Sequence, residues 1–332
     1  MRRIIILVLL IVFCLYFGKG LVACAVQGYS DEVAGKSRYN FLIVGFDDAY
    51  ENTDAIILAS FNTSKNEASF VQIPRDTYVY YGGRDMKING VYPSIKVDKK
   101  DEYAALCELS SLLSSALGFE SDGFVGVSTN AFSRLVDHIG GVDITFPSDF
   151  IYKDESGDVD IDIKKGTHHF SGKEALSFVR YRRGYALGDL GRIDAQKLFL
   201  SAFITKLKGS INPSVVLKMM CDSGEGFVSN IRVADLFGIV LRKNGRLVDA
   251  KIMYANLPGQ ALTSENTSYF IANKRASGEL FNALGYGITD FDCDKSFMPR
   301  ENKNFLDIYN SNSINFRIYD DSDLTRILIP SG

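Results

Sequence analysis

Short apolar runs alternate with longer amphipathic segments along most of this chain. The short runs are rich in Ile, Val and Phe and are bounded by turn-forming residues, which is typical of buried strands. The predicted strands are residues 40–46, 55–61, 68–74, 123–128, 141–146 and 249–259. The longer segments have helical spacing, and Gly118 ends one of them as a C-cap. The predicted helices are residues 101–117, 129–140, 171–182, 192–208, 212–221, 232–245 and 273–285. This alternation favours an α/β domain with helices packed on a mixed sheet.

The same pattern divides the chain into four parts. Residues 1–27 are apolar apart from three basic residues, and residues 28–38 are polar and predict a tether. We predict one domain over residues 39–300, because no repeat, low-complexity tract or internal linker interrupts it. The polar remainder, residues 301–332, is expected to form a C-terminal tail in which residues 314–321 add an edge strand.

The N-terminal part predicts a membrane anchor. The uncharged run of residues 4–18 is shorter than the roughly 20 residues that span a bilayer, but Lys19 can snorkel, so the combined stretch can reach across. Arg2 and Arg3 favour a cytoplasmic N-terminus. We therefore expect a single-pass protein of the cell membrane whose C-terminal domain is extracytoplasmic. Two alternatives stay open, a lipoprotein lipidated at Cys24 and a cleaved secretion signal.

Composition and charge exclude some classes of function. The chain has 332 residues, of which 46% are hydrophobic and 23% charged, enough to bury a sizeable core. The formal net charge of -3 becomes -6 without residues 1–27, which carry three basic residues and no acid. No nucleic-acid partner is expected, because such binding depends on an extended basic face. The five cysteines lack metal-ligand spacing, so no zinc site is indicated.

Carboxylates flank the connection between the first two predicted strands. Asp47 and Asp48 follow the first strand, and Asp54 opens the second. Residues just outside strand ends line the ligand crevice of an open α/β sheet. Two carboxylates meeting there suit Mg²⁺, which takes one or two carboxylates together with phosphate and water. Aspartate is also common in ordinary turns, and that alternative stays open.

A Pro-Arg-Asp triplet ends the third predicted strand. Arg75 would leave the sheet beside the carboxylates, and its guanidinium can bind phosphate oxygens with two parallel hydrogen bonds. Asp76 is expected to orient Arg75. Lys87, in the segment KINGVY, supplies either another cation for the site or a surface charge.

The densest group of cations lies in residues 178–199. Arg180 and Arg183 share one face if the predicted helix continues that far, whereas Arg182 points elsewhere. So many guanidinium groups predict a pyrophosphate site. The alternative is a surface helical hairpin held by salt bridges, which contribute little to stability.

The loop and helix that follow add further polar candidates. Asp189 is expected to lie in the loop. Arg192 and Gln196 share a face at the start of the next helix, where the helix dipole and backbone N–H groups favour an anion. We expect these residues to lie close to the arginines of the preceding helix.

Seven motifs stand in the order found in the LytR-CpsA-Psr family, which the chain therefore resembles. They are GFD, NTDA, IPRDTYV, KINGVY, GGVDI, SGKEALSFVRYR and DLGRIDAQ, and the similarity covers about residues 39–260. The resemblance implies a three-layer α/β/α sandwich with a central mixed sheet and an apolar groove for a lipid. It also implies an Mg²⁺-dependent transferase that moves a glycopolymer, such as teichoic acid or capsular polysaccharide, from a polyprenyl-pyrophosphate carrier to peptidoglycan through a phosphodiester bond.

The resemblance also assigns roles to individual residues. Asp47 and Asp54 fall on metal-binding carboxylates. Gln196 falls on a polar partner of the substrate, and Asp189 on an acidic position of the site. Arg183, on the face of Arg180, is expected to contact substrate. The cations that contact pyrophosphate are Arg75, Lys87, Arg180, Arg182 and Arg192.

The chain departs from the family pattern at two cationic positions. Asn52 and Ala195 stand where the family usually has arginine. Phosphate affinity or the preferred acceptor is therefore expected to differ, and a weakened or specialised activity is an alternative.

An apolar stripe follows the arginines along the helix from about residue 192. It consists of Leu198, Phe199, Ala202, Phe203 and Leu207. Such a stripe is commonly part of the packed hydrophobic core. We expect one side of this helix to pack in the hydrophobic core and the other side to line the lipid groove. Phe199 and Phe203 are expected to contact the lipid.

The predicted reaction is phosphoryl transfer without a covalent enzyme intermediate. A sugar hydroxyl of peptidoglycan attacks the phosphorus bonded to the polymer, and Asp76 or Asp189 is the candidate base. The alternatives are a polyprenyl-pyrophosphate phosphatase or pyrophosphatase, with water as acceptor, and a non-catalytic module that binds the lipid carrier or wall glycan. A membrane-linked transcription regulator would need a cytoplasmic DNA-binding segment, and only about three residues precede the apolar run.

Overall fold

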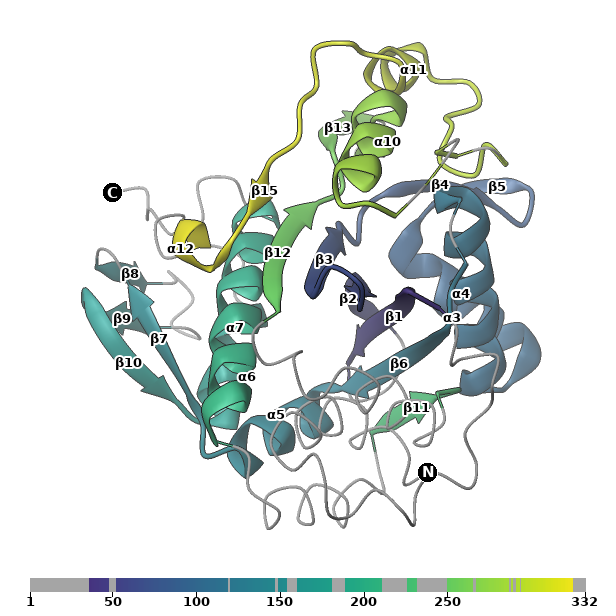
Figure 1. Cartoon of the computed structure of the whole chain (residues 1–332). Coiled ribbons are helices and arrows are strands. Elements are labelled where there is room, and N and C mark those ends of the chain that lie inside the picture. Colours follow the sequence, from purple (N-terminus) through teal and green to yellow (C-terminus); the bar gives the residue numbers. More distant parts are fainter. Residues whose placement is uncertain are drawn as a thin grey trace.

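A central mixed sheet of seven strands organises the computed structural model (Figure 1). Its strand order is β11-β6-β1-β2-β3-β12-β15. In that order the strands are Phe227–Ser229, Gly123–Ser128, Arg38–Phe46, Thr53–Asn62, Glu67–Ile73, Lys251–Asn256 and Ile318–Tyr319. The structure describes residues 36–47, 52–118, 120–146, 149–153, 160–180, 189–210, 226–231, 250–264, 267–286, 288, 291, 292 and 294–324.

The strand directions bring several loops to one end of this sheet. β1 runs parallel to β6, and β3 runs parallel to β12, whereas β2 is antiparallel to both of its neighbours. The carboxyl ends of β1, β3 and β6 therefore lie beside the start of β2. We call this the carboxyl end of the sheet, and in open α/β sheets it is where ligands bind.

Helices cover both faces of the sheet and complete three layers (Figure 1). One face carries α3 (Val91–Lys99), α4 (Glu102–Leu117) and α10 (Lys274–Ala283). The other carries α5 (Thr129–His138), α6 (Gly172–Arg180) and α7 (Asp189–Ser210). Side chains of a strand alternate between faces, so in β1 Phe41 joins the core under α5 to α7, while Leu42 and Val44 join the core under α4.

Smaller elements surround these layers. Four two-stranded sheets pair β4 (Tyr78–Tyr81) with β5 (Arg84–Lys87), β7 (Val142–Phe146) with β10 (Gly166–Phe170), β8 (Phe150–Lys153) with β9 (Asp160–Ile163), and β13 (Gly259–Ser264) with β14 (Thr267–Ala272). The short helices are η3 (Ile88–Gly90), α11 (Lys303–Tyr309) and α12 (Asp321–Leu324). α11 and α12 belong to the segment after residue 300, where Phe305, Tyr309 and Leu324 are buried.

The fold confirms the predicted α/β class and the mixed sheet. The edge strand expected in residues 314–321 forms as β15, which pairs antiparallel with β12. The strand predicted at 141–146 also forms, as β7, but it pairs with β10 outside the central sheet. The prediction that Asp189 lies in a loop is wrong, because α7 already begins there. An aspartate suits the first turn of a helix, where it complements the helix dipole.

Some predicted segments lie outside the described residues. These are the anchor of residues 1–27, most of the tether, and the helices expected at 212–221 and 232–245. Among the helices that the structure does describe, none is both long and apolar enough to cross a bilayer.

Candidate functional site

The connection from β1 to β2 places Asp47 and Asp54 at the carboxyl end of the sheet. Asp47 follows β1, and its backbone N–H donates to the carbonyl of Asn52 at 3.3 Å. The register shifts where Gly45 pairs with Ala55 and Phe46 with Thr53, so Asp54 is the extra residue of a β-bulge. Bulges commonly re-aim a side chain next to a functional site.

The turn after β3 places a guanidinium against Asp54. Arg75 Nη1 donates to Asp54 Oδ1 at 3.1 Å, and the two side chains are 18% and 20% exposed. Solvent therefore screens this pair less than it screens a surface pair. The backbone N–H of Asn89 donates to the carbonyl of Arg75 at 3.1 Å, which holds the turn against η3.

A second ion pair lies on the same turn. Lys87 Nζ is 3.0 Å from Asp76 Oδ1 and 5.9 Å from the ring centre of Tyr269. Burial raises the pKa of Tyr269, so its phenol stays neutral at physiological pH. We expected Asp76 to orient Arg75; the structure pairs Asp76 with Lys87 and Arg75 with Asp54. Arg75 and Asp76 are consecutive residues of the turn, and each forms an ion pair with a residue of another segment.

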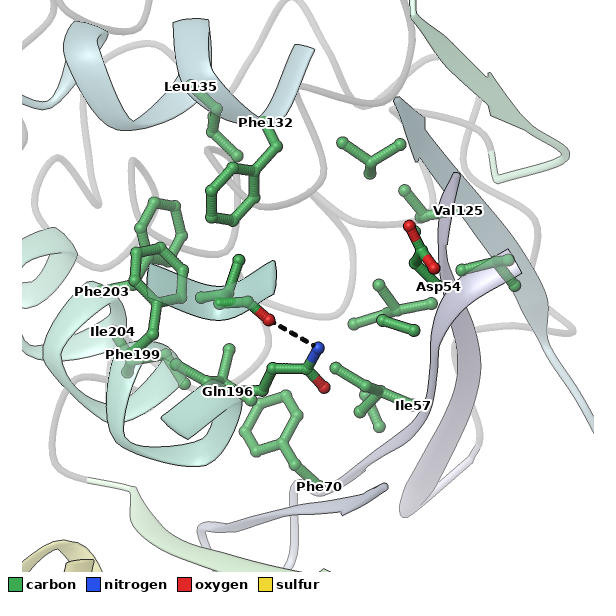
Figure 2. Close-up of a pocket in the computed structure, with 18 of the residues that line it drawn as sticks. Asp54, Ile57, Phe70, Val125, Phe132, Leu135, Gln196, Phe199, Phe203 and Ile204 are labelled. Carbon is green, nitrogen blue, oxygen red and sulfur yellow. Dashed lines mark hydrogen bonds between the residues drawn. The ribbon is translucent and has the colours of Figure 1, made fainter. Parts of the chain in front are cut away.

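An apolar pocket lies beside these charges, between the sheet and helices α5, α6 and α7 (Figure 2). Its cavity volume is about 290 Å³. Apolar side chains such as Ile57, Phe132 and Phe203 make up most of the lining. Within the described residues, the charged side chains that line it are Asp54 and Arg180. Two predicted site residues from segments far apart in the chain therefore meet at one cavity.

Gln196 adds a polar group to the wall of this pocket. Its Nε2 donates to the carbonyl of Val179 at 3.1 Å, which ties α7 to α6 (Figure 2). Its Oε1 is buried and accepts no hydrogen bond from the described residues. A buried acceptor without a donor costs free energy, so a ligand that donates a hydrogen bond here would remove that cost.

Residues of the apolar stripe on α7 differ in whether they line the pocket. Leu198 is buried in the core beneath the helix and does not line the pocket. Phe199 and Phe203 line the pocket with their ring centres 5.7 Å apart, and Phe132 of α5 approaches Phe199 at 4.9 Å. Ala202 is partly buried against the same core.

The arginine-rich segment is described in part. Arg180 is the last residue of α6 and is exposed at the pocket. Arg182 and Arg183 lie outside the described residues, as do the side chains of Asp189, Arg192 and Leu207. Their roles stay predictions.

The two departures from the family pattern have local explanations. Asn52 Nδ2 donates to Asp47 Oδ2 at 2.9 Å, so the amide now binds one of the carboxylates. Ala195 is 0% exposed and belongs to the core that lies under α5, α6 and α7.

The donor set at the carboxyl end of the sheet fits Mg²⁺. No group of three or more His, Cys, Asp and Glu side chains gathers within the described ranges. Asp47 and Asp54 supply carboxylate oxygens, and Mg²⁺ usually takes one or two carboxylates and completes its shell with phosphate and water. At such a site, phosphate oxygens and water would fill the remaining positions around the ion.

The sequence reasoning missed two polar residues of the pocket. Ser128 and Thr129 line it at the start of α5. A signal was present, because a Ser-Thr pair directly after a buried strand is typical of a helix N-terminus at the end of that strand.

Comparisons with known proteins give a consistent result. A sequence model of the LytR_cpsA_psr family matches residues 23–285. The polyisoprenyl-teichoic acid–peptidoglycan teichoic acid transferase TagV of Bacillus subtilis (strain 168) is 30% identical over 251 residues, which are 71% of this chain and 61% of TagV. TagT of the same strain, a transferase of the same description, is 29% identical over 62% of this chain and 64% of TagT. The chain thus spans less than two thirds of the length of these curated relatives.

Solved structures agree with the sequence relatives. The crystal structure of B. subtilis TagV is similar with a TM-score of 0.56 and 27% identity, covering 71% of this chain and 91% of that one. A structure described as TagT bound to LIIa-WTA is similar with a TM-score of 0.59 and 25% identity, covering 77% and 92%.

Proposed function

Because the chain belongs to the LytR-CpsA-Psr family, we propose that it moves a glycopolymer from a polyprenyl-pyrophosphate carrier to peptidoglycan through a phosphodiester bond. The relatives TagV and TagT are named as transferases of teichoic acid to peptidoglycan, which supports this class of reaction. The observation that carries the proposal is the apolar pocket with Asp54 and Arg180 in its wall. A polyprenyl pyrophosphate has matching chemistry, an apolar chain joined to a doubly phosphorylated head.

In this proposal the two parts of the carrier bind to different parts of the site. The isoprenoid chain enters the pocket among Phe199, Phe203 and Ile57, where burial of apolar surface stabilises it by roughly 25 cal/mol per Å². The pyrophosphate lies at the carboxyl end of the sheet, where Arg75, Lys87 and Arg180 supply positive charge. The predicted contacts of Arg182, Arg183, Arg192 and Gln196 belong to the same proposal.

The reaction transfers one phosphoryl group. The acceptor hydroxyl of a peptidoglycan sugar forms a bond to the phosphorus that carries the polymer, and the bond from that phosphorus to the bridging oxygen breaks. The hydroxyl proton passes to a carboxylate, Asp76 or Asp189, and polyprenyl phosphate leaves. The cations stabilise the charge that develops on the bridging oxygen, so the protein acts by positioning and electrostatics.

Mg²⁺ is part of the proposal. Asp47 and Asp54 would hold it, and it would neutralise phosphate charge and orient the pyrophosphate when bound. The ion pair of Arg75 with Asp54 would keep the guanidinium close to the same phosphate.

The cellular location that we propose follows from the proposed carrier and acceptor. Because the carrier is a membrane lipid and the acceptor is peptidoglycan, the domain would act outside the membrane, anchored by residues 1–27 or by a lipid on Cys24. Mass spectrometry of the mature N-terminus separates these two arrangements, since an uncleaved anchor keeps the residues before Cys24, whereas a lipoprotein begins at a lipidated Cys24.

The proposal is tested by incubating the full-length chain with a polyprenyl-pyrophosphate oligosaccharide, peptidoglycan oligomers and Mg²⁺. We expect a glycan–peptidoglycan conjugate with wild-type protein and little or none with Arg75→Ala or Asp54→Ala. Lys164→Ala is the matched control, because Lys164 pairs with Asp149 in an exposed position that is not part of the pocket wall. Conjugate formation that survives both site substitutions would reject the assigned site.

The same assay separates the alternatives. Free glycan phosphate without conjugate would favour hydrolysis with water as the acceptor. Carrier binding without turnover would favour a non-catalytic binding module, a reading that the replacement of two family arginines by Asn52 and Ala195 supports.

A further inference from the structure

The first turn of α5 lies at the same end of the sheet as the charged residues. In register, Ser128 at the end of β6 pairs with Phe46, and Phe46 pairs with Thr53 of β2. Neighbouring strands are ~4.8 Å apart, so the backbone at Ser128 is about 10 Å from the backbone at Thr53, next to Asp54. The N-terminus of α5 therefore faces the carboxylate and arginine pair across one intervening strand.

The N-terminal turn of α5 is held in a fixed position. Ser128 is its N-cap, and its Oγ accepts a hydrogen bond from Ala131 N at 3.3 Å. The Ser128 N–H donates to the carbonyl of Gly226 at 2.8 Å. Gly226 has a φ of +97°, and a Cβ there would lie 2.5 Å from Ser128 Oγ, so this close approach requires glycine.

The side chain that follows the cap has a buried hydroxyl group. Thr129 is 7% exposed and lines the pocket, and its Oγ1 has no hydrogen-bond partner in the part of the chain that the structure describes. Buried hydroxyl groups in folded proteins nearly always have a partner, since an unmade hydrogen bond costs free energy. A ligand in the pocket would supply the missing partner.

We propose that the first turn of α5, through the Thr129 hydroxyl and backbone N–H groups, binds a phosphoryl group of the substrate. This inference rests on the proposed function and deepens it. A helix N-terminus attracts anions through its dipole and its unpaired N–H groups. Arg75 with Asp54 would then hold the pyrophosphate from the side of β2 and β3, and Thr129 would hold it from the side of β6. Arg180 lines the pocket between α6 and these strands.

The assignment makes Thr129 a substrate-binding residue and predicts that removing its hydroxyl weakens binding without lowering stability. Thr129→Val keeps the shape and removes the hydroxyl, so the loss of a hydrogen bond to a charged group should weaken farnesyl diphosphate binding by about 10-fold or more. The thermal midpoint of the ligand-free protein should stay the same or rise, because the hydroxyl has no partner there to lose. Thr129→Ser keeps the hydroxyl and should bind nearly as well as wild type.

Thr63→Val is the matched control. Thr63 is also buried, but its Oγ1 donates to the carbonyl of Ser37 at 3.1 Å, at the opposite end of the sheet. This variant should lose stability and keep its affinity for farnesyl diphosphate.

The experiment measures binding of farnesyl diphosphate, inorganic pyrophosphate and farnesol to the full-length chain by calorimetry. We expect Thr129→Val to weaken both diphosphates and to leave farnesol unaffected. Unchanged diphosphate binding, or an equal loss for farnesol, would overturn the assignment of Thr129 and leave the proposed function intact. Wild-type protein that binds no diphosphate would overturn the proposed function and this inference together.

Discussion

Substituting Ile57 by Phe should stabilise the protein while blocking its ligand. Ile57 lies on β2 and points into the pocket opposite Gln196 (Figure 2). A cavity of ~150 Å³ is enough for a benzene ring, and this one has about 290 Å³, so a phenyl ring fits without strain.

The magnitude follows from the apolar surface that the ring buries. Phe has three more side-chain carbons than Ile, and at ~0.8 kcal/mol per buried methylene they contribute about 2 kcal/mol. Fixing the ring in one rotamer costs roughly 0.5–1 kcal/mol. The free energy of unfolding should therefore rise by about 1–2 kcal/mol, or a few degrees in thermal midpoint.

The ligand assay should change in the opposite direction. If the ring displaces two methylene groups of the isoprenoid chain, the affinity for farnesyl diphosphate falls by about 10-fold. Inorganic pyrophosphate, which has no chain, should bind as it does to wild type.

Ile56→Phe is the matched control for this substitution. Ile56 is the preceding residue of β2, is 0% exposed and packs in the opposite core. Overpacking there should destabilise the protein by about 1–3 kcal/mol. If Ile57→Phe destabilises the protein as much as Ile56→Phe does, or leaves farnesyl diphosphate affinity unchanged, the pocket is not a binding site for an apolar chain.

Three further substitutions or treatments test other parts of the account. Arg75→Lys keeps the charge but loses the two-donor guanidinium, and calorimetry should show farnesyl diphosphate binding about 10-fold more weakly; affinity close to wild type would speak against a direct phosphate contact. Inorganic pyrophosphate should raise the thermal midpoint of the wild type, and removing divalent ions with EDTA should reduce that rise. In Asp54→Asn, EDTA should leave the effect of pyrophosphate unchanged. An equal EDTA effect on both proteins would place the ion elsewhere. Burial raises the pKa of Asp292 to about 6, above the roughly 4 of an unfolded aspartate, so its contribution to stability is present below about pH 4 and lost as the pH rises through about 6. In urea unfolding, the free-energy difference between wild type and Asp292→Asn should fall by roughly 2 kcal/mol from pH 4 to pH 6, and a constant difference would show that Asp292 does not hold its proton.

Much of the fold was predictable because local pattern and tertiary packing agree. The runs at 40–46 and 68–74 would present apolar residues to both faces of a sheet, and both form interior strands of the central sheet. The run at 141–146 predicted a strand but not its partner. Its buried and exposed positions alternate, with Asp143 and Thr145 exposed, which is typical of a sheet with one face in solvent. That alternation was the sign that it lies outside the central sheet.

The site was predictable where a charged residue directly follows or opens a strand. Asp54 and Arg75 meet because β2 and β3 are neighbours, and strand neighbours can be inferred from short connections. The pairing of Asp76 with Lys87 depends on the path through β4, β5 and η3, which the residue pattern does not specify. The burial of the Thr129 hydroxyl is likewise a property of the packed pocket, and no local sequence signal records it.

The central claim is that charged residues from separate segments surround a pyrophosphate whose lipid chain enters the apolar pocket. A crystal structure of the chain with farnesyl diphosphate and Mg²⁺ tests it most directly. We predict the phosphates between Arg75, Arg180 and Thr129, with the farnesyl chain against Phe199 and Phe203. A diphosphate bound away from these residues, or a chain that lies outside the pocket, would contradict the account.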